Sequence, residues 1–271
     1  MIYGAIQGFS EFLPISANAH RTLVAYLLGW NEPSGTFLGA LSFGSFLALI
    51  VYFRHDFSAM ISCALQCVLF RKKPMTLDER LPFFIAIACL PLALVWFYFE
   101  PQILEMDWTP ISIAIAFAVS GGLMWFIDSR NRNTKGMFDW NWFESLMMGL
   151  ANLLMLIPGV GRLGSSLTGA YARNFKHEAS AKFSFYCLAP VMGVSAYLHL
   201  RGISFHLAVA PSENMTWLSW GVGGAVSFLA SMLALDAFMK QTARSGVGQY
   251  AVYRVLLAIG VGAAYWIRSR V

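Results

Sequence analysis

The chain has 271 residues, of which 58% are hydrophobic and only 12% are charged. This composition leaves too little polar surface to cover a water-soluble domain, and it predicts one all-α domain over residues 1–271 that crosses a membrane several times. The net charge of +5 comes from bases scattered over short loops. Such scattering is typical of membrane orientation, so we expect no nucleic-acid partner.

The first apolar segment, residues 1–30, is interrupted by the polar stretch "GFSEFLPISANAHRTL" around Pro14. Each half is too short to cross a bilayer, for which a helix needs about 20 apolar residues. Backbone that leaves helical geometry at membrane depth must be buried in protein or line a wet cavity, because lipid satisfies none of its polar groups. We therefore expect a re-entrant helical hairpin with its tip at Pro14.

Six uninterrupted apolar runs are long enough to span the bilayer as helices. They lie at residues 36–54, 82–99, 110–128, 180–199, 216–238 and 250–267. A shorter run at 57–70 is predicted to be an interfacial helix, since about 14 helical residues reach only about 21 Å. The chain is thus expected to be a polytopic membrane protein with about six transmembrane helices.

A second broken segment, residues 142–172, is interrupted at Pro158 and Gly159. Each broken segment is followed by three spans, which predicts two repeats, about residues 1–128 and 142–267. An odd number of spans separates the hairpins, so they enter from opposite sides and the repeat has inverted topology. Broken helices of such repeats meet near the bilayer midplane, and we expect the two tips to face each other.

The loops at 54–81, 130–135, 173–176 and 240–244 hold most of the loop Lys and Arg residues. Loops rich in these bases stay in the cytoplasm. Both termini are therefore expected on the outer side.

The two tips combine residue types that bind and split a phosphate group. The first tip supplies Glu11, Ser16, Asn18 and His20, and the second supplies Gly161, Arg162, Ser165 and Ser166. An arginine holds phosphate oxygens with two N–H groups, and a helix beginning near Arg162 would present its free N–H groups to the same anion. We interpret His20 as a nucleophile or proton carrier, and Glu11 as its orienting partner, a base or a cation ligand. The serines are candidates to donate to phosphate or to attack it.

Structural interpretations of the same residues stay open. Glutamate and histidine in a hairpin also occur as partners of a neighbouring helix, and small hydroxyl residues commonly pack membrane helices together. Arg162 fits a snorkelling interface residue as well. Lys182 and Arg254 lie near span ends and are predicted to snorkel.

Two stretches at the tips carry a family resemblance. "QGFSEFLPISANAH" (7–20) and "PGVGRLGSSLTG" (158–169) resemble, in the right order, the two signatures of the undecaprenyl-diphosphate phosphatase family linked to bacitracin resistance. The resemblance implies six spans, two re-entrant hairpins, a homodimer and a bacterial plasma (inner) membrane location. Position by position, it implies functional roles for Glu11, Ser16, His20, Arg162 and Ser166.

Several positions depart from the family pattern, among them Asn18, Ala19 and Ser42, and four others bear most on the chemistry. Gln7 replaces the first glutamate, Ala17 the second serine of the Ser-Ser pair, and Gly161 and Leu163 the serines that flank the arginine. Ala17 lacks a nucleophilic group. A divalent cation, Mg²⁺ or Ca²⁺, held by Glu11 together with Gln7 would bind more weakly, since an amide oxygen carries no charge. The chain is expected to be a divergent member.

The implied activity is hydrolysis of undecaprenyl (polyprenyl) diphosphate to the monophosphate and phosphate, which recycles the lipid carrier for cell-envelope synthesis. Glu11, Ser16, His20 and Arg162 are the expected catalytic residues, with Gln7, Asn18, Gly161, Ser165 and Ser166 in substrate binding. The alternative is a lipid-phosphate transporter that has lost hydrolysis, because inverted repeats with broken helices are also transporter architecture. Phosphate release by the purified protein distinguishes the two.

Overall fold

The computed structural model describes residues 1–30, 33–104, 108–200 and 217–268, and within them it contains helices and no strand. The α-helices in chain order are α1 (Ile2–Glu11), α2 (Ala17–Leu28), α3 (Gly35–Tyr52), α4 (Arg54–Leu69), α5 (Leu77–Leu104), α6 (Pro110–Arg130), α7 (Trp142–Asn152), α8 (Arg162–Ala172), α9 (His177–Leu200), α10 (Trp217–Thr242) and α11 (Gly248–Arg268). Two short 3₁₀ helices, η1 (Met137–Asp139) and η2 (Leu153–Leu156), flank α7.

The two broken segments form helical hairpins, as predicted. The chain leaves helical geometry between α1 and α2 around Pro14, and between η2 and α8 around Pro158. Positive φ angles mark both breaks: +63° at Ser16, +105° at Gly159 and +80° at Gly161. Two of the three residues are glycines, which adopt such angles without a steric penalty.

Five helices of the described residues are long and apolar enough to cross a membrane: α3, α5, α6, α10 and α11. The sixth predicted span forms α9, which has sufficient length at 24 residues. It is not among the five, and it carries polar residues such as Lys182 and Ser195. Much of α9 is buried inside the protein, where its serines meet protein rather than lipid.

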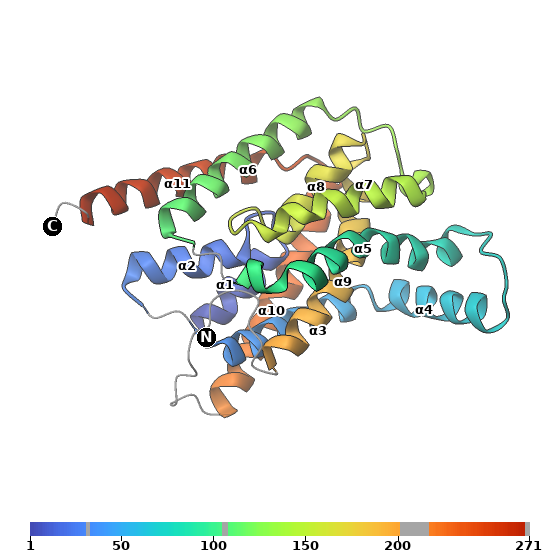
Figure 1. Ribbon diagram of the computed structural model, residues 1–271, viewed down its shortest axis with the longest axis horizontal. Coiled ribbons are helices and arrows are strands. Elements are labelled where there is room, and N and C mark those ends of the chain that lie inside the picture. The colour runs from blue at the N-terminus through green and yellow to red at the C-terminus, as the bar shows by residue number, and fades with distance from the viewer. Residues whose placement is uncertain (31–32, 105–107, 201–216, 269–271) are drawn as a thin grey trace.

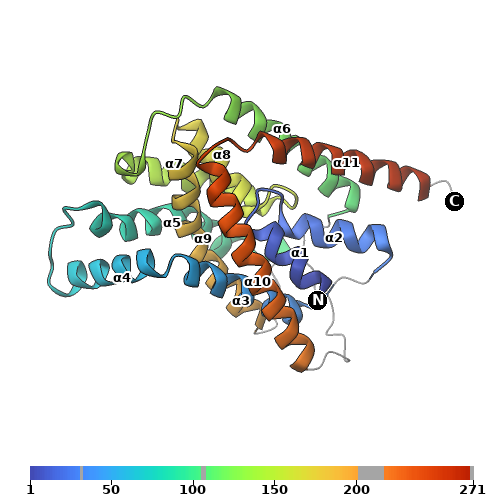
Figure 2. The ribbon, with the colours of Figure 1, turned by 180° about the vertical axis from the view of Figure 1, so that it is seen from behind.

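Helices far apart in sequence pack in corresponding pairs (Figures 1 and 2). The first spans after each hairpin, α3 and α9, pack together, and so do the third spans, α6 and α11. The hairpin helix α1 packs against α10, the second span of the other half, while α7 packs against α5. Each hairpin helix thus packs on the second span of the other half, which is the pattern that a two-fold repeat predicts.

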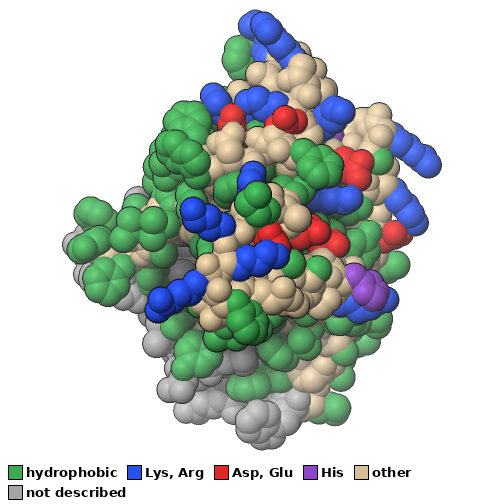
Figure 3. All heavy atoms as spheres, turned by 90° about the vertical axis from the view of Figure 1, so that its right-hand side faces the viewer, with side chains coloured by type: hydrophobic (Ala, Val, Ile, Leu, Met, Phe, Trp, Pro, Cys, Tyr) green, Lys and Arg blue, Asp and Glu red, His purple; other side chains and the backbone are tan. Residues whose placement is uncertain are grey.

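Charged side chains gather at one end of the molecule. Figure 3 views the end opposite the two termini of Figure 1, and Lys and Arg side chains are numerous there. The loops before α5 and α7 lie at this end. The predicted segregation of loop bases to one side therefore agrees with the arrangement of the helices.

Close packing of α3 on α10 depends on small residues. Ser45 Oγ lies 2.9 Å from Ser227 Oγ, and a Cβ on Gly44 would lie 2.2 Å from the carbonyl oxygen of Gly224. Small residues let membrane helices approach until their backbones touch.

We expect Gly44→Ala to lower the free energy of unfolding by about 1–3 kcal/mol, because the added methyl group forces the two backbones apart. The measurement is thermal unfolding of the purified protein in detergent. Gly122→Ala is the matched control, since no atom lies within 4 Å of a Cβ on Gly122. Equal melting temperatures for the two variants would contradict this packing.

Candidate functional site

The two hairpin tips touch. A Cβ on Gly161 would lie 2.9 Å from Ser16 Cα and 3.0 Å from Ser16 Cβ, closer than real Cβ atoms come. Only a residue without a side chain permits this contact. The predicted meeting of the tips is therefore confirmed, and Gly161 is part of its geometry.

Beside this contact lies a cavity of about 330 Å³. The first tip contributes Glu11, Ser16 and Asn18 to its wall, and the second contributes Gly161 and Arg162. The remaining wall is mainly apolar and comes from α5, from α9 and from apolar residues of the two hairpins such as Met155 and Ile157. It includes Leu92, Ala93, Trp96, Phe97, Val191 and Val194. Polar groups thus converge at one end of a cavity with otherwise apolar walls, the usual form of a small-molecule site.

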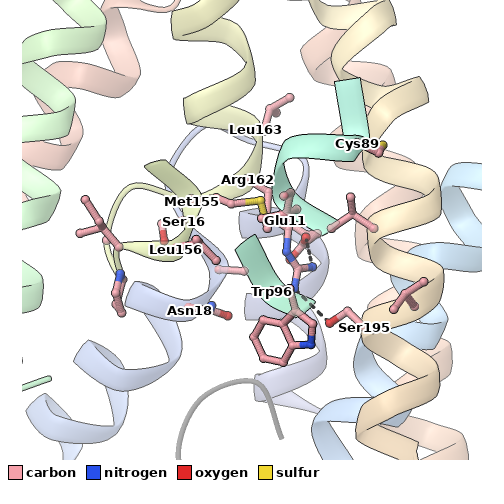
Figure 4. A pocket seen from close by; sticks show the side chains of 18 of the residues that line it. Glu11, Ser16, Asn18, Cys89, Trp96, Met155, Leu156, Arg162, Leu163 and Ser195 are labelled. Carbon is pink, nitrogen blue, oxygen red and sulfur yellow. Dashed lines mark hydrogen bonds and ion pairs between the residues drawn. The ribbon is translucent and has the colours of Figure 1, made fainter. Parts of the chain in front are cut away.

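Arg162 forms the centre of the polar end. Its Nη1 donates to Glu11 Oε1 over 2.9 Å and its Nη2 to Ser195 Oγ over 3.1 Å, so the guanidinium lies between α1 and α9 (Figure 4). The side chain of Glu11 is 5% exposed and that of Arg162 18%. Their ion pair compensates two charges that lipid would otherwise penalise. Arg162 is therefore an interior residue and does not snorkel.

Gln7 and Arg21 extend this network away from the cavity. Gln7 Nε2 donates to Glu11 Oε2 over 3.0 Å, and Gln7 Oε1 accepts from Arg21 Nη1 over 2.8 Å. Arg21 also donates to Asn18 Oδ1. Gln7 thus holds Glu11 by a hydrogen bond but does not line the cavity. The contacts of Arg21 were not predicted from the sequence.

Two helices begin at the cavity without a side-chain cap. Ser16 precedes α2 and Gly161 precedes α8, and at neither N-terminus do backbone N–H groups donate to a capping side chain. By contrast, the side chain of Asn141 accepts from Phe143 N and Glu144 N at the start of α7. The first N–H groups of a helix have no acceptor within the helix and carry its positive dipole end. Both α2 and α8 therefore present groups that bind an anion.

His20 does not line this cavity. Its Nδ1 lies 3.0 Å from the carbonyl oxygen of Ser16, its Nε2 lies 2.7 Å from the Tyr253 hydroxyl, and its ring stacks on Tyr253. A carbonyl oxygen accepts only, so Nδ1 carries the proton and Nε2 accepts from Tyr253. The arrangement holds the start of α2 against α11.

The two predicted serines of α8 also lie away from the cavity. Ser166 Oγ donates to Asn152 Oδ1 over 2.6 Å and ties α8 to α7. Ser165 Oγ donates to the carbonyl oxygen of Arg162 over 2.8 Å and lines a second cavity of about 150 Å³. Among the nine predicted site residues, the structure brings Glu11, Ser16, Asn18, Gly161 and Arg162 to one wall.

The prediction that Arg254 snorkels is wrong. The residue is 1% exposed, and its Nη2 donates to the carbonyl oxygens of Gly159 and Val160 and to Ser120 Oγ. Its guanidinium also lies 4.7 Å from the centre of the Phe117 ring. Sequence position near a span end was misleading, because the fold turns the side chain inward onto the second tip. Its position within an apolar helix was the sequence signal for a buried, paired arginine.

We expect Arg254→Met to loosen the second tip, since it leaves buried carbonyl oxygens without a donor, at a cost of about 1–3 kcal/mol each. Thermal unfolding in detergent should show a lower melting temperature, and turnover should fall because Arg162 follows this tip directly. Lys240→Met is the control, as Lys240 pairs with Asp236 on an exposed surface. Equal effects of the two changes would contradict the role of Arg254.

The side chains do not fit a divalent cation held by Glu11 with Gln7. Both carboxylate oxygens of Glu11 already accept hydrogen bonds, and the amide oxygen of Gln7 accepts from Arg21. Within the described ranges, no group of three or more His, Cys, Asp or Glu side chains is arranged to hold a metal ion.

Comparisons with known proteins agree with the paired tips. The family model "Bacitracin resistance protein BacA" matches residues 1–260. The chain is 28% identical over 265 residues to "Undecaprenyl-diphosphatase 1" of Pseudoalteromonas translucida (strain TAC 125), with 96% of each chain covered. It is 29% identical over 268 residues to "Undecaprenyl-diphosphatase" of Moorella thermoacetica (strain ATCC 39073 / JCM 9320), covering 99% of this chain and 97% of the relative. The match over nearly the whole length, together with the two joined tips, places the chain in the bacitracin resistance protein BacA family.

Proposed function

We propose that this protein is an integral-membrane hydrolase that converts undecaprenyl diphosphate, or a related polyprenyl diphosphate, to the monophosphate and inorganic phosphate. This reaction recycles the lipid carrier for cell-envelope synthesis. One observation carries the proposal: Arg162 and the uncapped N-termini of α2 and α8 converge on one cavity with apolar walls. Both relatives named above bear the name of this activity.

The apolar walls suit the lipid part of such a substrate. Phe97 of α5 and Val194 of α9 line the cavity, and both are also exposed on the protein surface, at 79% and 56%. The cavity therefore reaches the lipid-facing surface between α5 and α9. The polyprenyl chain lies along these walls, and its diphosphate reaches the polar end.

Charge stabilisation is the main contribution of the protein to the reaction. Arg162 and the N–H groups at the starts of α2 and α8 hold the terminal phosphate, whose transition state spreads negative charge over its oxygens. Ser16 lines the cavity and donates its hydroxyl to the same oxygens. Water attacks the terminal phosphorus, the bond from that phosphorus to the bridging oxygen breaks, and the monophosphate leaves.

Glu11 is the proton acceptor in this proposal. It is the only carboxylate among the described residues that line the cavity. Arg162 and Gln7 fix its position and leave lone pairs on its oxygens to accept a proton from water. His20 takes an indirect part, because it positions the backbone of Ser16 rather than reaching the cavity.

We also propose that the protein lies in the plasma (inner) membrane of a bacterium, with the base-rich end of Figure 3 in the cytoplasm. Cysteine labelling of the 71–80 loop from either side of the membrane tests this orientation. Association into a homodimer remains a prediction, which the mass of the detergent-purified particle tests.

The experiment for the function is phosphate release from a C55 polyprenyl diphosphate by detergent-purified protein. We expect stoichiometric phosphate and monophosphate. If folded protein releases none but moves the lipid across the bilayer of a proteoliposome, the protein is a transporter and the hydrolase proposal fails.

A further inference from the structure

The polar end of the cavity holds the guanidinium of Arg162 and the carboxylate of Glu11, and a second guanidinium, that of Arg21, lies behind them. Arg162 binds one oxygen of Glu11, while Arg21 is joined to the other oxygen through Gln7. Gln7 is 1% exposed and Glu11 7%, so this chain of contacts is enclosed by protein. With Gln7 neutral, the formal charges of Arg162, Arg21 and Glu11 alone sum to one positive charge in excess.

The oxygens that would bind a divalent cation here are already occupied. Such a cation takes carboxylate, carbonyl and water oxygens. Glu11 Oε1 accepts from Arg162, Glu11 Oε2 from Gln7, and both Gln7 Oε1 and Asn18 Oδ1 from Arg21. The guanidinium of Arg21 thus lies at the side-chain oxygens that a metal would use.

A glutamate in place of Gln7 would alter this balance. Two carboxylates four residues apart on α1 would face the same two arginines, and the excess of positive charge would disappear. A diphosphate that binds there would then need a bound cation to balance its negative charge. The amide at position 7 and the arginine at position 21 therefore act together.

We propose that Arg21 supplies, in this protein, the positive charge that a divalent cation would otherwise bring to the site, so that the hydrolase works without a metal ion. This inference rests on the proposed hydrolase function. Arg21 acts through Gln7 and Asn18 and through its field, as a positioning residue, whereas Arg162 contacts the phosphate.

The test compares phosphate release in EDTA with release in Mg²⁺ or Ca²⁺. For the natural protein we expect the rates to agree within about twofold, and for Arg21→Gln we expect a fall of at least about tenfold in EDTA. Arg21→Lys keeps the charge and should retain more activity than Arg21→Gln. Arg54→Gln is the control for loss of one charge, because Arg54 is exposed on α4.

The double variant Gln7→Glu with Arg21→Gln gives the decisive result of this test. It restores a pair of carboxylates and removes the competing guanidinium, so its turnover should appear only with Mg²⁺ or Ca²⁺. A purely structural role for Arg21 would not create a metal requirement. Natural protein that works with Mg²⁺ but not in EDTA would overturn the inference while leaving the hydrolase function intact.

A binding measurement covers the case in which no condition gives turnover, which would refute the hydrolase function. Calorimetry with farnesyl diphosphate as the probe then tests whether binding depends on Arg21 or on a metal ion. Binding in EDTA that is weakened by Arg21→Gln supports the inference, and binding that requires Mg²⁺ contradicts it.

Discussion

Replacing Arg162 by alanine is expected to lower phosphate release by about 100- to 1,000-fold, the loss typical of removing one donor that stabilises a charged transition state. The guanidinium donates to Glu11 and Ser195 and lies on the cavity wall between the two halves of the chain. Its loss also leaves Glu11 as a buried carboxylate without its cation. That carboxylate would repel the diphosphate, so both turnover and affinity should fall.

Two controls separate this effect from general damage. Ser195→Ala removes one partner of the guanidinium but keeps its charge, and we expect a loss of about tenfold at most. Arg130→Ala removes a charge from an exposed helix end and should leave turnover unchanged. Phosphate release by all three variants, each shown to unfold cooperatively, is the measurement. An Arg162→Ala protein as active as Arg130→Ala would remove the basis for the proposed site.

Replacing Gly161 by alanine is expected to reduce turnover by more than about tenfold, because the new methyl group cannot coexist with the backbone of Ser16. Gly161 has φ +80° and ψ +148°, a conformation that costs a residue with a side chain about 1–3 kcal/mol. The Cβ would lie 2.9 Å from Ser16 Cα, so the tips must separate. Separation moves the N-termini of α2 and α8 apart and weakens their joint hold on phosphate.

Gly29→Ala provides a matched control for the backbone strain. Gly29 also has a positive φ, of +68°, but a Cβ there has no atom within 4 Å. Both variants should lose some thermal stability, and only Gly161→Ala should lose most of its turnover. Similar turnover in the two proteins would show that the contact between the tips does not matter for activity.

The broken helices and their meeting were predictable because the signals are local. Proline and glycine interrupt two apolar segments, and an odd number of spans between them dictates opposite entry. The contact of Gly161 with Ser16 agrees with the expected meeting of the two tips. The halves themselves, about 1–128 and 142–267, stay a prediction that the paired helix contacts support.

Two contacts that sequence reasoning missed join residues far apart in the chain. Ser195 reaches Arg162 from α9, and Arg254 reaches the second tip from α11. No spacing in the sequence reveals such pairs, since the packing of distant helices creates them. His20 shows the converse, because a residue within the motif of the first tip contacts a neighbour outside the cavity, here Tyr253.

The most direct test of the site is a structure of the protein with a non-hydrolysable polyprenyl methylenediphosphonate. We predict the terminal phosphonate within hydrogen-bonding distance of Arg162 and of the first N–H groups of α2 and α8, with the lipid chain between α5 and α9. A headgroup bound at the second cavity beside Arg254, or at the base-rich end of the molecule, would contradict this account.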